Sequence, residues 1–198
     1  MIVKHGLRNC TAVLFAGGLL SLQVYLTEAQ AESRAHQHGV GQLNIAIEGH
    51  HLEMELSVPG ADVVGFEHAP STKAVRLTVE EAAHKLKDGK KMIAFPPDAK
   101  CAFEKAEVRS TMLGDHDKHD HHAHGKKDHH KGEHAAQEVH GEFRVHYQVA
   151  CARMAKLTHL DITFFKAFPT AKKLVTRWIT PGRQGAATLT ASKSRLTF

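Results

Sequence analysis

The stretch EFRVHYQVAC, residues Glu142–Cys151, alternates apolar and polar side chains more regularly than any other part of the chain. Successive side chains of an extended strand point to opposite faces, so this pattern predicts a strand with one apolar and one polar face. The predicted core face carries Phe143, Val145, Tyr147, Val149 and Cys151, and the opposite face carries Glu142, Arg144, His146 and Gln148. The chain is therefore expected to build a sheet that covers a hydrophobic core.

Shorter versions of this pattern occur on both sides of the stretch. Leu43–Ile47 and Leu52–Val58 predict a hairpin that turns at Glu48-Gly49-His50 and ends at Pro59-Gly60. Further strands are expected at residues 93–95, 101–108, 160–164, 174–180 and 186–191.

One helix is expected between the hairpin and the later strands. Thr78 and Glu81 have the spacing of a capping box, and Gly89 follows as a stop signal. Between them an apolar stripe of helical period is formed by Val79, Ala82, Ala83 and Leu86. About seven strands and one clear helix predict an α+β fold that is mostly antiparallel β.

The first thirty-one residues have the features of a signal peptide. Lys4, His5 and Arg8 precede a mostly apolar run at residues 11–26, and Ala29-Gln30-Ala31 has the small-x-small pattern that signal peptidase cleaves. The run is short for a membrane anchor, and no second run follows. We therefore expect a signal peptide at residues 1–31, a single domain at 32–198, no membrane insertion after cleavage, and a periplasmic location in a Gram-negative cell.

Two cysteines remain once Cys10 leaves with the signal peptide. Cys101 and Cys151 in an oxidising compartment predict one disulfide. A zinc thiolate pair is the alternative, but neither cysteine has a closely spaced partner. We expect the bridge to hold together the ends of the histidine-rich segment that lies between the two cysteines.

That segment, DHDKHDHHAHGKKDHHKGEH at Asp115–His134, interrupts the predicted domain. Eight of its twenty residues are histidine, five are acidic, four are lysine, and none is a large apolar residue. Such a composition cannot bury a core and predicts a flexible, disordered loop. Neutral imidazole is a common ligand of divalent transition metals, and neighbouring carboxylates favour a dication. The predicted metal ligands are His116, His119, His121, His122, His124, His129, His130 and His134. The alternatives are a solvated pH-sensitive spacer and an incidental low-complexity insertion.

Other histidines outside this His-rich segment are further candidates. His36 and His38 form an HxH pair whose imidazoles share one side of an extended chain. If the strands at 142–151 and 160–164 pair, a set of polar residues would converge on one metal site. This set contains His140, His146, His159 and Asp161, beside Glu142. The alternative is an ordinary polar sheet face.

Several function classes are disfavoured. The formal net charge of +5 is modest and scattered, so nucleic acid is not an expected partner. The chain lacks HExxH, GxSxG, Walker A and GxGxxG motifs, so we predict no enzymatic activity. Zinc is the expected metal, with nickel and copper(II) left open by the ligand types. A non-catalytic β-rich interaction module with a solvated spacer, and a zinc-dependent hydrolase, remain the alternative functions.

The chain resembles the ZrgA-type periplasmic zinc-uptake family. The resemblance rests on the HxHG opening (His36, His38, Gly39), on PGADVVGFEHAP at 59–70, on the central His/Asp tract, on the strand that ends at Cys151, and on Gln184-Gly185-Ala186. It implies a zinc-binding accessory protein that assists uptake or buffering of zinc beside an importer in the inner membrane. The His-rich segment and the HxHG pair are the metal-binding positions that it suggests.

Overall fold

The computed structural model describes residues 37–113 and 141–198, and nothing is stated below about the structure of the other residues. Within these ranges the strands are β1 (Val40–Glu48), β2 (His51–Pro59), β3 (Ile93–Ala94), β4 (Cys101–Ser110), β5 (Glu142–Cys151), β6 (His159–Ile162), β7 (Lys173–Ile179), β8 (Gln184–Leu189) and β9 (Arg195–Thr197). The helices are α1 (Gly60–Val63), α2 (Lys73–Lys87), α3 (Gly89–Met92) and α4 (Phe164–Ala167).

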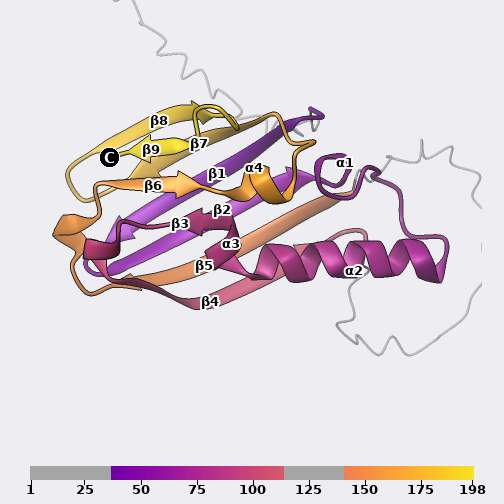
Figure 1. Cartoon of the computed structure of the whole chain (residues 1–198), viewed down its shortest axis with the longest axis horizontal. Coiled ribbons are helices and arrows are strands. Elements are labelled where there is room, and N and C mark those ends of the chain that lie inside the picture. Colours follow the sequence, from indigo (N-terminus) through magenta and orange to yellow (C-terminus); the bar gives the residue numbers. More distant parts are fainter. Residues whose placement is uncertain (1–36, 114–140) are drawn as a thin grey trace, which may run out of the picture. The chain divides into compact units, whose positions relative to one another are not determined.

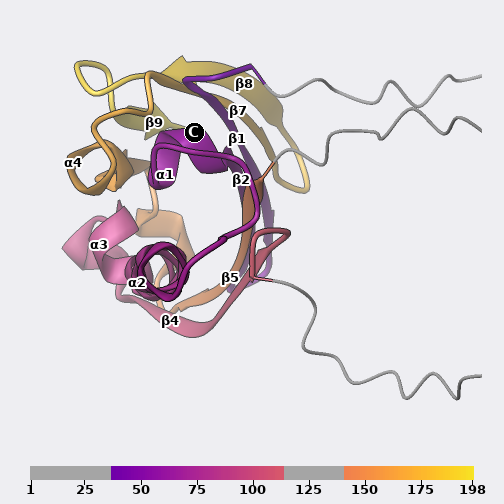
Figure 2. The ribbon, with the colours of Figure 1, turned by 90° about the vertical axis from the view of Figure 1, so that its right-hand side faces the viewer.

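The strands form two sheets. The large sheet has the order β4-β5-β2-β1-β7-β8, and the small sheet has the order β3-β6-β9. All pairings are antiparallel except the pairing of β1 with β7. The large sheet is curved, and the four helices and the small sheet lie on its concave side (Figures 1 and 2). The predicted α+β fold, mostly antiparallel β, is confirmed.

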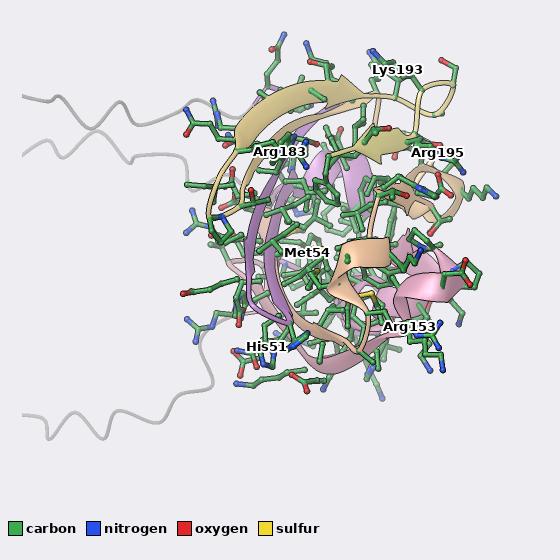
Figure 3. The ribbon with its side chains drawn as sticks, turned by 90° about the vertical axis from the view of Figure 1, so that its left-hand side faces the viewer. His51, Met54, Arg153, Arg183, Lys193 and Arg195 are labelled. Carbon is green, nitrogen blue, oxygen red and sulfur yellow. A yellow bond between two sulfur atoms is a disulfide. The ribbon has the colours of Figure 1, made fainter. Side chains whose placement is uncertain are left out.

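The core fills the space between the sheets. The predicted core face of β5 is buried, and the same face of the large sheet contributes Leu43, Leu52, Met54 and Leu174. Figure 3 shows Met54 inside this space and Arg195 at the outer side of the small sheet. The buried Tyr147 hydroxyl donates a hydrogen bond to the Leu86 carbonyl of α2 at 2.5 Å, which satisfies the one polar group of that ring.

The helix begins earlier than the sequence suggested. The N-cap of α2 is Thr72, whose hydroxyl accepts a hydrogen bond from the Val75 amide at 3.2 Å. Thr78 lies inside the helix, and its hydroxyl donates to the Ala74 carbonyl at 3.3 Å. The expected capping box at Thr78 and Glu81 is therefore wrong, because a threonine inside a helix can bond to the preceding turn instead of capping. The buried stripe of Val79, Ala82 and Leu86 agrees with the prediction.

The short strands also differ from expectation. The strand expected at residues 160–164 ends at Ile162, and Phe164 begins α4. The three-residue strand β9 was not predicted, since so short a segment carries no periodic pattern. None of the helices in the described ranges is long and apolar enough to cross a membrane.

The disulfide between Cys101 and Cys151 is confirmed. The two cysteines face each other in the β4–β5 ladder, which runs to the pair Ser110 and Phe143 at its other end. At the usual rise per residue, the nine steps along β4 place the bridge about 30 Å from that end. The expectation that the bridge holds the ends of the His-rich segment is therefore wrong. The hydrogen-bonded strands hold Ser110 and Phe143 together, and the bridge closes the opposite end of the strand pair.

Candidate metal centre

Most of the predicted metal ligands lie outside the described residues. These are His36, His140 and the eight histidines of the His-rich segment, and the predicted signal peptide at 1–31 lies outside as well. The structure instead shows where the chain leaves β4 and where it returns to β5. We call these two ends, residues 111–113 and 141–142, the tract mouth.

The tract mouth is anchored to the segment that follows β2. The Gly141 amide donates to the Glu67 carbonyl at 2.8 Å, and the Gly60 amide donates to the Gly141 carbonyl at 2.6 Å. On the other side of the mouth, the Glu142 amide donates to the Thr111 hydroxyl at 3.1 Å. A Cβ atom at Gly141 would lie 2.6 Å from the sulfur of the buried Met112, so this close packing requires glycine. The two described positions between which the His-rich segment is inserted are therefore fixed beside each other.

His38 lies beside the same segment. Gly39 adopts φ +81°, a left-handed conformation that favours glycine, and its amide donates to Asp62 Oδ1 at 2.7 Å. The His38 side chain is 68% exposed, and its Nε2 atom lies 3.5 Å from Glu67 Oε1. We call the group formed by His38, Asp62 and Glu67 the His38 corner. It unites the HxHG, PGAD and GFEHAP motifs, which are separated in sequence.

Asp62 is the most unusual carboxylate of this corner. It is only 3% exposed, and its backbone carbonyl accepts a hydrogen bond from the Thr170 hydroxyl at 2.5 Å. Within the described ranges no donor reaches its Oδ2 atom. Burial raises the pKa of Asp62, while the Gly39 amide and the charge of His38 lower it. The negative charge of Glu67 raises the pKa further, and Lys172 opposes this rise.

Sequence reasoning did not select Asp62 or Glu67 as candidate ligands. Both lie in the PGADVVGFEHAP segment, which was recognised only as the basis of the resemblance. The sequence feature that could have pointed to them is the presence of two carboxylates in one short motif that carries the resemblance together with the HxHG histidines.

His146 lies on the outer face of the large sheet, as the alternation of apolar and polar residues in Glu142–Cys151 predicted. Its Nε2 atom is 2.6 Å from Glu53 Oε2. The strand registers place one residue from each strand in a single row across this face: Glu107, His146, Glu55, Asn44, Arg177 and Ala186. An open groove of about 740 Å³ on this face is lined by His146, Glu53 and Glu55 on one side and by Arg177 and Ile179 on the other. His146 is thus already paired with a carboxylate in this structure.

His159 and Asp161 lie in the other sheet. β6 pairs with β3 and β9, whereas β5 pairs with β2 and β4, so the strand pairing needed for a shared site with His146 and Glu142 does not occur. His159 Nε2 lies 3.7 Å from Asp161 Oδ2. Asp161 accepts hydrogen bonds from Arg195 Nε at 2.7 Å and from Arg195 Nη2 at 2.8 Å. This hydrogen bonding lowers the pKa of Asp161, so Arg195 holds the carboxylate as an ion pair.

No group of three or more His, Cys, Asp or Glu side chains within residues 37–113 and 141–198 is already arranged to hold a metal ion. The His38 corner offers one imidazole and two carboxylates beside the tract mouth. Imidazole nitrogen and carboxylate oxygen are both ordinary zinc ligands.

Comparison with protein families identifies a match that covers most of the chain. Residues 35–198 match the family described as "ZrgA family zinc uptake protein". The match covers all of the described residues and the His-rich segment between them. A search among curated proteins found no match.

Proposed function

Because the chain belongs to the ZrgA family of zinc uptake proteins, we propose that it captures Zn(II) on the His-rich segment and passes the ion on during uptake. Membership of this family gives the chain a role in zinc uptake, with zinc as its binding partner. The observation that carries the finer proposal is the composition of residues 115–134, where eight imidazoles and five carboxylates occur without a large apolar side chain. Several such groups can surround one dication, and the segment has enough of them for more than one ion.

The fold supports capture by a tethered segment. The tract mouth fixes both ends of residues 114–140 at neighbouring positions on β4 and β5, where Ser110 is paired with Phe143. Rearrangement of the segment around metal ions would therefore leave the pairing of the sheet intact. The disulfide at the far end of the same strand pair makes this base more stable.

The place of action follows from the predicted signal peptide. Cleavage after Ala31 would release a chain of residues 32–198 into the periplasm, where an importer in the inner membrane is the natural receiver of the zinc. Weak binding by many similar ligands suits a protein that passes its ion on. Other divalent transition metals that accept imidazole would compete for the same segment.

Counting bound zinc ions tests this proposal. The test compares the intact protein with a full-length variant in which the eight histidines of the His-rich segment are replaced by glutamine, called here the tract variant. Calorimetric titration with ZnCl₂ at pH 7.5 is expected to show several ions per intact chain and at most one per tract variant. The control replaces His50, His51 and His84, which are exposed and lie outside the tract mouth and the His38 corner. This control is expected to bind as many ions as the intact protein. Equal numbers of ions for the tract variant and the intact protein would contradict capture by this segment.

A further inference from the structure

We infer that the His38 corner is a separate zinc site, held by the folded domain and independent of the ligands in the His-rich segment. His38 Nε2 and the carboxylates of Asp62 and Glu67 would bind the ion. The inference rests on the proposed function for its choice of metal, but it concerns different residues and has its own test.

The donor set matches an exchangeable zinc site. One imidazole and two carboxylates supply three protein ligands, which leaves a fourth position for water or for an incoming ligand. The two carboxylates together balance the charge of the dication.

The buried oxygen of Asp62 points to a missing partner. A buried carboxylate normally receives hydrogen bonds on both oxygens, since leaving a charged group unpaired in a buried place costs free energy. Asp62 Oδ1 has the Gly39 amide, whereas no group within the described ranges donates to Oδ2. The charge of Lys172 acts on the carboxylate, but no hydrogen bond joins them. A cation at the corner would satisfy Oδ2.

Two of the three proposed ligands lie close together in the structure. His38 Nε2 already lies 3.5 Å from Glu67 Oε1. The backbone next to His38 is fixed, because the Gly39 amide is bonded to Asp62 itself. His38 is the most exposed member, so its ring can turn toward the two carboxylates at little cost in packing. In the described residues the three groups are not yet arranged around one metal ion, and a rotation of the His38 ring would bring them closer to that arrangement.

The position of the corner gives it a role in zinc transfer. The Glu67 carbonyl accepts a hydrogen bond from the Gly141 amide, so the corner lies beside the tract mouth. An ion released by the segment has an ordered site beside it. We therefore place one ordered zinc ion between capture by the segment and delivery to a receiver.

The test uses the tract variant, so that the corner is measured without the eight histidines. Calorimetric titration with ZnCl₂ at pH 7.5 is expected to show one ion per chain. Adding His38→Gln, Glu67→Gln or Asp62→Asn is expected to weaken this binding by more than about tenfold, the lower end of the loss seen when groups that merely support a metal ligand are changed. His84→Gln, at an exposed position of α2, is the matched control and is expected to leave the affinity unchanged.

The variants are chosen to preserve the fold. Asparagine at position 62 keeps an oxygen that accepts from the Gly39 amide, and His38 is exposed. If Asp62→Asn lowers the thermal stability, its zinc affinity is not used. The test then relies on His38→Gln, because His38 is exposed and its replacement should not disturb the fold. The inference is overturned if the tract variant binds no zinc, or if His38→Gln and Glu67→Gln leave its affinity unchanged. In either case, the difference in the number of bound zinc ions between the intact protein and the tract variant would still measure capture by the His-rich segment.

Discussion

Zinc binding by the His-rich segment is expected to weaken by about three orders of magnitude between pH 7.5 and pH 5. Only neutral imidazole binds a metal ion, and histidine in short peptides titrates near pH 6.5, so about 3% of imidazoles are neutral at pH 5. An ion held by two such histidines therefore loses affinity by roughly 10³, apart from the smaller change at its carboxylate ligands. The measurement is the zinc dissociation constant at both pH values and constant ionic strength.

The tract variant is the control for this pH dependence. The zinc that this variant still binds has fewer histidine ligands. Its dissociation constant should therefore change less between pH 7.5 and pH 5 than that of the intact protein. A dissociation constant of the intact protein that changes by less than about tenfold over this range would show that carboxylates, which stay ionised at pH 5, hold the metal. The imidazole-based capture would then be wrong.

Reduction of the Cys101–Cys151 bridge is expected to lower the free energy of unfolding by about 4 kcal/mol, the chain-entropy value for a loop of this length. The two cysteines are separated by 50 residues, and the loop includes the whole His-rich segment. β4 lies at the edge of the large sheet and pairs only with β5, so it depends on this bridge more than an inner strand would. Urea unfolding with and without dithiothreitol measures the change.

A variant with both cysteines replaced by serine is the control, since dithiothreitol should not alter its stability. A loss below about 1 kcal/mol on reduction would show that the unfolded chain is already restricted without the bridge. Because the bridge lies about 30 Å from the tract mouth, reduction should leave the number of bound zinc ions unchanged as long as the protein stays folded.

The large sheet was predictable where side-chain alternation reports a strand directly. The pattern at Glu142–Cys151 identified the core face of β5, and the β1–β2 hairpin followed from two alternating runs around Gly49. The parallel pairing of β1 with β7 was not predictable, because it joins residues far apart in sequence and leaves no local pattern. For the same reason, the sequence left open whether β5 and β6 pair, and the structure places them in different sheets.

The candidate site was predictable only in part. The imidazoles of the HxH pair and of the His-rich segment were identified by residue type. Asp62 was noted only as part of the PGADVVGFEHAP motif, and only the folded chain brings its carboxylate to the Gly39 amide. The partner of Asp161 was equally hidden in the sequence, since the short strand β9 places Arg195 directly beside it.

The most direct measurement is uptake of radioactive zinc by cells that lack their own copy of this protein and grow in a chelator-buffered, zinc-poor medium. Cells given the intact chain are expected to accumulate zinc faster than cells given the tract variant, at equal amounts of folded protein. Cells given the His50, His51 and His84 control should match the intact chain. Equal uptake with the intact chain and the tract variant would contradict a role for the His-rich segment in supplying zinc.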